Sequence, residues 1–483
     1  MPTLDALLAE HAPAPTVSAA TVRKGAATAP VLVVLDDDPT GTQSVHDLPV
    51  LTRWDPEHLE WALSQSVPAV YVLTNTRSLD PAEAEHRNRE IADVALSVAG
   101  RLGIDIAFVS RSDSTLRGHF PLETDTLIRQ ITASGGSDID GIILVPAFPD
   151  AGRVTVDGVH YFVDPNQDFR AVPVAETEFA RDATFGFASS DLASWVQEKT
   201  AGRVAAEDVL HIDLRTIRVK GAEGVAEILG AASNAIPVIV DMVVEEDLRE
   251  VALGIQLAQS NGKHFLYRVG PPFVRAIVGQ KPREPLTAAD IFTSDADTSD
   301  SPATGGLVVV GSHVGLTTRQ LDDLASSDID QTSIVVDVPT VIDPARRETY
   351  LAELVDAVYA ALADRTVVVS TSRTLVKTTD GAGSLDISRQ VSAALVHIVR
   401  TVLELRAPRF VIAKGGITSS DLAAHGLGMS RAVAKGPMLP GIVSLWEPKD
   451  GPGLGIPYVV FAGNVGGTTS LTEVVRTLSK EIA

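Results

Sequence analysis

The sequence predicts an α/β protein of two domains, each a mostly parallel sheet flanked by helices, with an active-site cleft between the domains. Three observations carry this prediction: the length of 483 residues, short apolar runs that alternate with amphipathic helical segments, and a break in that pattern over residues 285–306. Domains ordinarily hold about 100–200 residues, so a chain of this length should contain more than one. Apolar strands that alternate with helices indicate a parallel sheet covered on both faces.

The candidate strands form two series. The first occupies the N-terminal half, with helical patterns such as 81–101 between its members, at 31–35, 69–73, 105–109, 141–147, 207–212 and 237–243. The second follows the break, at 307–311, 333–338, 366–371, 409–413, 441–445 and 457–462. The stretch between them is rich in Ser, Thr and Asp, which is typical of a linker. We therefore predict an N-terminal arm over 1–29, a first domain over 30–285, a linker over 286–306 and a second domain over 307–483.

Composition and charge narrow the function. The formal net charge is −22, and such an acidic surface disfavours nucleic acid and anionic membranes as partners, because phosphate neutralisation dominates nucleic-acid binding. The chain has no cysteine, which excludes disulfides, thiolate catalysis and cysteine-ligated metals. It shows neither a signal-peptide pattern nor an apolar run of about 18 residues. We expect a cytoplasmic protein with a small-molecule substrate; its oligomeric state stays open, with a homodimer as one alternative.

The stretch "VLVVLDDDPTGTQSV" raises the main question of the N-terminal half, because three adjacent carboxylates follow an apolar strand. Ligands of doubly wound sheets lie outside the carboxyl ends of the strands. Polar clusters follow the next candidate strands as well, in "TNTRS", "SRSDSTLRGH" and "VPAFPDAGR". In a parallel sheet these clusters meet at one edge. The residues that we single out are Asp37, Asp38, Arg77, Arg111, Ser112, Asp113 and Ser114.

These residue types suit a small polyhydroxylated anion. Carboxylates and hydroxyls bind substrate hydroxyls, and an arginine binds a carboxylate through two parallel hydrogen bonds. Asp37 or Asp38 could act as a general base, because a neighbouring carboxylate raises the pKa of one of them. The competing interpretation of each turn is helix capping and turn chemistry.

A second reading of the acidic turn is a phosphatase motif. Asp36, Asp38 and Thr40 fit D-x-D-x-T after an apolar strand, as in haloacid-dehalogenase-like phosphatases, in which the first aspartate is the nucleophile. The N-terminal half has no lysine at an obvious strand end, and the later acidic pair at 322–323 lies in a helical pattern, so this motif is weakly supported. A non-catalytic sugar-acid-binding protein is a third alternative.

The C-terminal half repeats one design, in which a strand is followed by a glycine turn and then a helix. The turns are "GSHVG", "KGGITSS" and "AGNVGGTTS". Glycines let a phosphate approach the backbone, and a helix N-terminus supplies unpaired N–H groups. The alternative for each turn is a tight connection without a ligand. Together they favour a nucleotide or polyphosphate site that includes Ser312, Gly415, Gly416, Ile417, Thr418 and Gly463.

These motifs, in this order over nearly all of residues 30–483, resemble those of the four-carbon acid sugar kinase family. The resemblance implies ATP-dependent phosphorylation of an acid such as threonate, erythronate or 3-oxo-tetronate. It places the sugar acid on the N-terminal domain and ATP on the C-terminal domain. Substrate contacts then fall on Asp38, Arg77 and the run from Arg111 to Ser114, and ATP contacts on Ser312, Gly415–Thr418 and Gly463. Mg²⁺ is expected with ATP, and no metal ligand is assigned.

Overall fold

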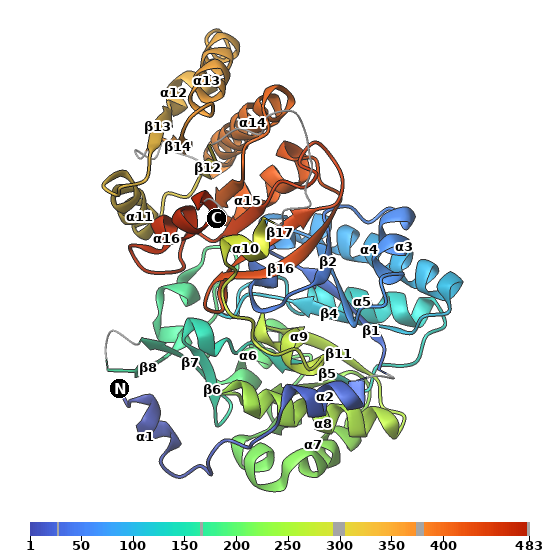
Figure 1. Cartoon of the computed structure of the whole chain (residues 1–483). Coiled ribbons are helices and arrows are strands. Elements are labelled where there is room, and N and C mark those ends of the chain that lie inside the picture. Colours follow the sequence, from blue (N-terminus) through green and yellow to red (C-terminus); the bar gives the residue numbers. More distant parts are fainter. Residues whose placement is uncertain (27–28, 165–167, 293–304, 373–380, 481–483) are drawn as a thin grey trace. The chain divides into compact units, whose positions relative to one another are not determined.

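The computed structural model describes residues 1–26, 29–164, 168–292, 305–372 and 381–480 (Figure 1). The chain divides into two compact units. The first comprises Met1–Val45 and Trp54–Pro282, and the second comprises His46–Arg53 and Arg283–Ala483. The second unit therefore includes a short segment from the N-terminal half of the chain.

The first unit is built on a parallel sheet, which confirms the predicted fold class. Its strands lie in the order β3 (Ala69–Leu73), β1 (Val31–Asp36), β4 (Ile106–Arg111), β11 (Phe265–Val269), β5 (Gly141–Val145), β10 (Ile236–Val240) and β9 (Leu210–Ile212). Every neighbouring pair in this order is parallel. The sequence prediction missed β11, whose apolar run is interrupted by Arg268. It also missed a small antiparallel sheet of β6 (Arg153–Val156), β7 (Val159–Asp164) and β8 (Arg170–Pro173).

Helices between these strands follow local sequence signals. The longest in this unit, α4 (Pro81–Leu102), begins where the side chain of Asp80 accepts a hydrogen bond from the backbone N–H of Glu83, and it ends at Gly103 with a φ of 67°. The other helices of this unit are α1 (Leu4–Leu8), α2 (Ala19–Gly25), α3 (Pro56–Leu63), α5 (Leu122–Ala133), α6 (Leu192–Lys199), α7 (Gly221–Gly230), α8 (Glu245–Ser260) and α9 (Pro272–Ile277).

The second unit combines a parallel and an antiparallel part. The parallel strands are, in order, β13 (Gln331–Val336), β14 (Thr366–Thr371), β12 (Leu307–Val310), β15 (Val411–Lys414) and β18 (Tyr458–Phe461). The antiparallel strands β17 (Ile442–Pro448), β16 (Arg431–Leu439) and β2 (Leu48–Leu51) follow. Because β2 pairs with β16, the segment His46–Arg53 belongs to this unit.

The helices of the second unit are α10 (Ala288–Ile291), α11 (Gly315–Ala325), α12 (Val338–Ile342), α13 (Arg347–Ala361), α14 (Gly381–Leu405), α15 (Gly416–Asp421) and α16 (Ser470–Ser479). Within the predicted linker over 286–306, α10 is helical and residues 293–304 lie outside the described residues. In the part of the chain that the structure describes, no helix is both long and apolar enough to cross a membrane.

The core of the second unit should be sensitive to truncation of Phe410. This side chain is fully buried beside Phe461, Leu471 and Val475, and a Cβ on Gly306 would overlap its ring. We expect Phe410→Ala to lower the free energy of unfolding by about 3–5 kcal/mol, measured by urea denaturation. Val335→Ala is the matched control, because Val335 is 56% exposed and its truncation should cost no more than about 0.5 kcal/mol. Equal effects of the two substitutions would contradict this packing.

Candidate functional site

The acidic turn lies at the carboxyl end of β1, between the ends of β3 and β4. Asp36 is in register with Leu73 on one side and Arg111 on the other, so the three strands end together. The side chains of Asp36 and Asp37 are each 2% exposed, whereas that of Asp38 is 20% exposed. Two of the three carboxylates are therefore buried, and the third is open to a ligand.

Arg111 binds the buried end of this turn. Its guanidinium forms an ion pair with Asp36, donates to the backbone carbonyl of Asp38, and lies 3.7 Å from the carboxylate of Asp37. Burial raises the pKa of Asp36 to about 7, because the cost of removing the carboxylate from water exceeds the attraction of Arg111. Since Arg111 is itself 2% exposed, its hydrogen-bonding capacity is directed to the turn.

Arg77 binds the outer two carboxylates. Its Nε and Nη2 donate to the two carboxylate oxygens of Asp37 at 3.2 and 2.6 Å, and its Nη1 lies 3.5 Å from Oδ2 of Asp38. Burial raises the pKa of Asp37, although Arg77 and Arg111 oppose the shift. Burial acts in the same sense on Asp38, but Arg77, Arg111 and the donors of Thr40 together outweigh it and lower the pKa of Asp38. Asp38 is therefore the ionised, partly exposed member of the turn.

The capping interpretation of Asp38 is confirmed for one of its two carboxylate oxygens. Its Oδ1 accepts hydrogen bonds from the N–H and the hydroxyl of Thr40 at 2.9 and 2.5 Å, so it caps the 3-10 turn Pro39–Ser44. Its Oδ2 lies toward Arg77. One oxygen thus holds the turn in place, while the other lies at the partly exposed edge of the cluster.

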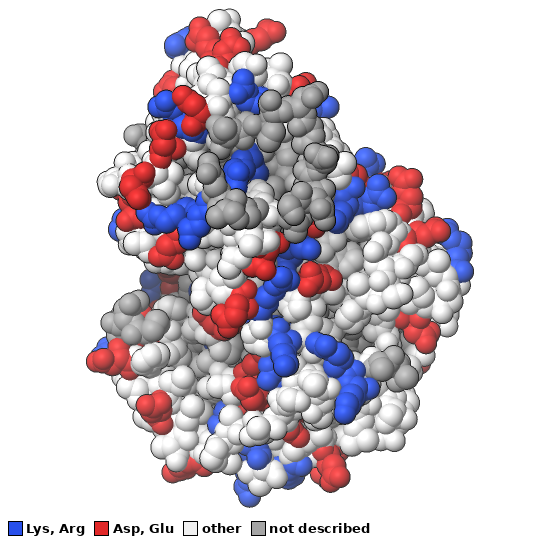
Figure 2. Space-filling view, in the orientation of Figure 1, with Lys and Arg blue, Asp and Glu red and all other residues white. Residues whose placement is uncertain are grey.

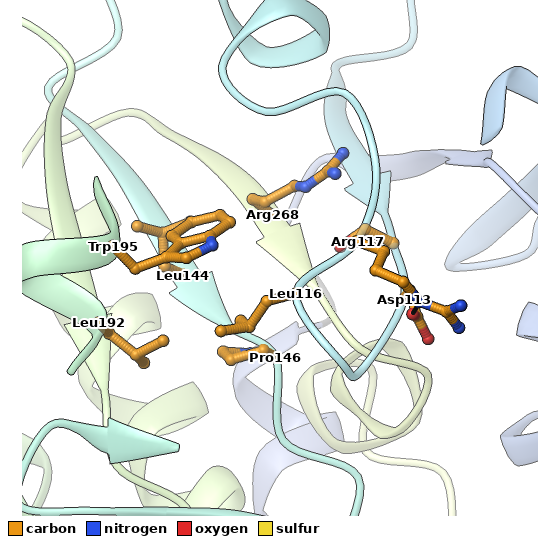
Figure 3. A pocket seen from close by; sticks show the side chains of 9 residues that line it. Asp113, Leu116, Arg117, Leu144, Pro146, Leu192, Trp195 and Arg268 are labelled. Atoms are coloured by element: carbon orange, nitrogen blue, oxygen red, sulfur yellow. Dashed lines mark hydrogen bonds and ion pairs between the residues drawn. The ribbon is translucent and has the colours of Figure 1, made fainter. Parts of the chain in front are cut away.

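The run after β4 lines a pocket beside the acidic turn. Ser112 and Asp113 belong to its wall, and its volume is about 20 Å³, or about 330 Å³ when the open space at its mouth is counted. Asp113 accepts hydrogen bonds from Thr115 and from Nε of Arg117, the latter at 2.6 Å. Burial opposes ionisation of Asp113, but Arg77 and Arg117 outweigh it and hold its pKa well below the usual range. Figure 3 shows the side chains that line this pocket.

Ser114 is fixed by a buried histidine. The backbone carbonyl of Ser114 lies 2.8 Å from Nε2 of His160, and Nδ1 of His160 lies 2.9 Å from the hydroxyl of Thr155. Because a carbonyl accepts and cannot donate, Nε2 carries the proton and Nδ1 accepts from Thr155. His160 is therefore neutral, and burial lowers its pKa to about 4.

Two residues of this site were not selected from the sequence. Arg268 of β11 donates to the hydroxyl of Ser110 at 2.7 Å and forms an ion pair with Glu123 of α5. Glu123 also accepts a hydrogen bond from Thr76 at 2.5 Å. Arg268 follows no visible strand end in the sequence, and only the pairing of β11 with β4 brings it beside the pocket. The sequence feature that could have pointed to Arg268 is its position inside an otherwise apolar run.

In the second unit, the three predicted glycine turns meet at neighbouring strand ends. β12, β15 and β18 are adjacent and parallel, and Ser312, Gly415 and Gly463 follow them. A Cβ on Gly463 would overlap the hydroxyl of Ser312, and Gly415 has a φ of +126° that side chains rarely adopt. Thr317 of α11 donates to the carbonyl of Gly463 at 2.9 Å and ties the first and third turns together.

The rest of the predicted nucleotide residues lie around the second of these turns. Gly416 and Ile417 open α15, with Ile417 59% exposed, and Thr418 is buried against Gly311 and Gly415. Lys414 is buried, donates to the carbonyl of Ala462 at 3.0 Å and lies over the Phe461 ring, and burial lowers its pKa to about 7. Together the turns form a backbone-lined edge that suits phosphate oxygens.

The described residues hold no cluster of three or more His, Cys, Asp or Glu side chains that could bind a metal ion. On the face of the molecule in Figure 2, basic and acidic side chains are interspersed.

The acidic turn should not tolerate a side chain at Gly41. A Cβ there would overlap both the guanidinium of Arg111 and the carboxylate of Asp36. We expect Gly41→Ala to lower the free energy of unfolding of the first unit by about 1–3 kcal/mol, measured by chemical denaturation. In the control Gly100→Ala, on the open surface of α4, a Cβ meets nothing within 4 Å and should stabilise the helix by up to about 1 kcal/mol. Unchanged stability in Gly41→Ala would contradict the close packing.

His160 should make the first unit acid-sensitive. Its pKa is lowered to about 4 in the folded state from 6.5, so between these values the unfolded state binds more protons and stability falls as the pH falls. The loss from pH 7 to pH 4 attributable to His160 is about 3 kcal/mol. We expect His160→Gln to flatten the pH profile of the unfolding free energy in this window. The exposed His86→Gln should leave the profile unchanged, and identical profiles for wild type and His160→Gln would contradict the assignment.

Comparison with known proteins agrees with the division of the chain into two units. Residues 32–277 match the family model of a sugar-binding N-terminal domain, and residues 307–471 match that of a nucleotide-binding C-terminal domain. No curated protein sequence matches the chain.

Solved structures show the same fold at low sequence identity. A Salmonella typhimurium LT2 protein, provisionally named a tRNA synthase, is 17% identical with a TM-score of 0.65, and the match covers 92% of this chain and 98% of that one. A Haemophilus influenzae protein from a family of unknown function is also 17% identical, with a TM-score of 0.58 and coverages of 92% and 99%. The two matched domain models span both units and show that the chain belongs to the four-carbon acid sugar kinase family.

Proposed function

We propose that this chain is an ATP-dependent kinase that phosphorylates a hydroxyl of a small sugar acid, of the class of threonate, erythronate or 3-oxo-tetronate. The observation that carries the proposal is the acidic turn. Within the matched sugar-binding domain, the ionised, partly exposed Asp38 lies beside the partly exposed Arg77, at the end of a parallel strand. Carboxylate and guanidinium together offer both an acceptor and a donor to a polyhydroxylated acid.

The residues of the first unit take different roles in this proposal. Asp38 accepts hydrogen bonds from substrate hydroxyls, because it is the most exposed carboxylate of the acidic turn. Asp37 is buried and oriented by Arg77, and Arg111 holds the turn in position. Ser112, Asp113 and Ser114 form the substrate edge that follows β4. Either Asp37 or Asp38 takes the proton of the reacting hydroxyl.

The second unit supplies the phosphate site. The turns at Ser312, Gly415–Thr418 and Gly463 would hold the phosphates of ATP through backbone N–H groups and hydroxyls, and their glycines fit such close approach. Mg²⁺ bound with ATP would neutralise phosphate charge. Mg²⁺ in kinases takes most of its ligands from phosphates and water. The lack, among the described residues, of a carboxylate cluster that could hold a metal ion is therefore compatible with its presence.

The reaction follows from these roles. The acceptor hydroxyl oxygen forms a bond to the γ-phosphorus, the bond from that phosphorus to the β–γ bridging oxygen breaks, and the hydroxyl proton passes to an aspartate. Phosphoryl transfer needs mainly positioning and charge stabilisation. The rigid turn contributes to positioning. Because the pKa of Asp38 is lowered, its carboxylate stays ionised at neutral pH and can orient the substrate hydroxyl.

The phosphatase alternative requires Asp36 as the nucleophile. The side chain of Asp36 is 2% exposed and forms an ion pair with Arg111, so it is poorly placed to attack a phosphate ester. The matched nucleotide-binding domain also has no role in that mechanism. A non-catalytic sugar-acid-binding protein would bind the same ligands but release no ADP.

Asp38→Asn tests the proposal in an ADP-release assay over a panel of tetronates. We expect turnover to fall about 10²- to 10⁴-fold, because the variant loses the acceptor of the substrate hydroxyl, while ATP affinity measured by calorimetry stays near wild type. Asp93→Asn, on the exposed surface of α4, is the control for charge removal.

Three outcomes would contradict parts of this proposal. Weakened ATP binding in Asp38→Asn would refute the division of labour between the domains. Phosphate release from phosphorylated tetronates without nucleotide would favour the phosphatase. Tetronate binding by the wild type without ADP release would leave only the binding protein.

A further inference from the structure

The pocket beside the acidic turn combines donors with an apolar wall. Two arginines and one indole N–H line it, and the rest of its surface comes from Ser112, Asp113, Leu116, Leu144, Pro146 and Leu192. The pocket lies wholly within the first unit, at the ends of β4, β5 and β11. Figure 3 shows Trp195 and Leu192, both from α6, on one side and Arg268 and Asp113 on the other.

In the part of the chain that the structure describes, the indole N–H of Trp195 is buried without a hydrogen-bond acceptor to account for its position. Its side chain is held rigidly, because the residue is 4% exposed and its ring stacks on Phe120 at a centroid distance of 4.9 Å and an angle of 19°. Its indole nitrogen is buried, and it has no hydrogen-bond acceptor among the described residues. A buried N–H without an acceptor costs folding free energy, so its position next to a pocket needs a reason.

The arginines that were expected to bind the substrate carboxylate are largely occupied. Arg111 is buried among the backbone and carboxylates of the acidic turn, and Arg77 places two nitrogens on Asp37. The pocket offers two other guanidiniums, those of Arg117 and Arg268. Arg117 is ion-paired with Asp113 and Asp182. Arg268, by contrast, binds Glu123 and Ser110 through Nη1. Asp113 is already bound by Arg117 and Thr115, which limits its repulsion of a second anion.

We propose, resting on the proposed function, that this pocket binds the carboxylate of the sugar acid. The indole N–H of Trp195 donates to one carboxylate oxygen, and the guanidinium of Arg268, whose Nη1 is held by Glu123, donates through its other nitrogens. The indole N–H, which lacks an acceptor in the described part of the chain, is a donor, and a carboxylate is an acceptor without a hydrogen to offer. The apolar wall of Leu116, Leu144 and Leu192 excludes water and strengthens these interactions. The hydroxyls of the same molecule are then free to meet Asp38 at the acidic turn.

Trp195→Phe tests this inference, because it keeps the aromatic stack on Phe120 and removes only the N–H. We expect binding of threonate and erythronate, measured by calorimetry without ATP, to weaken about 10- to 100-fold. Threitol and erythritol keep the hydroxyls but lack the carboxylate, so their binding should be the same in both proteins. In turnover assays, the KM for the acid should rise while kcat and the KM for ATP stay near wild type.

Trp54→Phe is the matched control. Trp54 lies in the same unit, under the guanidinium of Arg87 and away from the pocket, so its replacement should leave acid binding unchanged. The chain has four tryptophans, and a change in emission on acid binding should persist in Trp54→Phe and disappear in Trp195→Phe.

The possible failures separate the two proposals. Equal acid affinity in wild type and Trp195→Phe would overturn the carboxylate pocket and leave the kinase proposal intact. Equal weakening of acids and alcohols would also overturn it, because the indole would then act on packing alone. A loss of acid affinity in Trp195→Phe without any ADP release by the wild type would overturn the kinase and retain the pocket. A wild type that binds no tetronate would refute both.

Discussion

The buried charge cluster at the end of β1 is the constraint on which the first unit's candidate site depends. Three consecutive carboxylates would repel one another at a strand end, and two arginines from neighbouring strand ends hold them there. Removing one partner of a buried ion pair leaves an uncompensated charge, which is far more costly than the pair is stabilising. Three carboxylates against two guanidiniums also leave an excess of negative charge. The raised pKa of Asp36 reflects its burial together with this excess.

The three aspartates of the cluster differ in exposure, and so in the roles that they can take. Asp36 and Asp37 are buried and matched with guanidiniums, so their geometry is fixed before any ligand arrives. Asp38 is capped through one oxygen and partly open at the other. A preorganised acceptor costs little reorganisation when a ligand hydroxyl binds, and the proposed phosphoryl transfer would need such an acceptor.

The second unit orders its candidate site by different means. Its three turns rely on neutral groups: glycines that permit close approach, and side chains of α11 that bind loop carbonyls. Thr317 reaches Gly463, and Gln320 donates to the carbonyls of Val465 and Gly467 at 3.1 and 2.8 Å. Backbone and hydroxyl donors suit an anion that carries its own metal ion, whereas an ion-paired cluster suits an acid with several hydroxyls.

The α/β class, most strands and the turns that form the candidate sites could be predicted from the sequence. These properties are local, because apolar runs, glycines and capping residues act within a few positions of one another. The acidic turn and the glycine turns were visible for that reason. The sequence did not reveal that β2 pairs with β16, and so that His46–Arg53 belongs to the second unit. The two strands are far apart along the chain, and no local pattern near β2 indicates its partner.

Which charged side chains are buried in ion pairs and which stay partly exposed became clear only from the three-dimensional packing. In the sequence, Arg77 and Arg111 both follow candidate strands and nothing distinguishes their roles. Arg268 interrupts an apolar run and gives no sign of a role in a site. In the structure Arg111 is buried on Asp36, Arg77 keeps a partly exposed edge, and Arg268 lines the pocket beside Trp195. Burial and ion pairing depend on strands that are far apart along the chain, and so a list of residue types does not contain them.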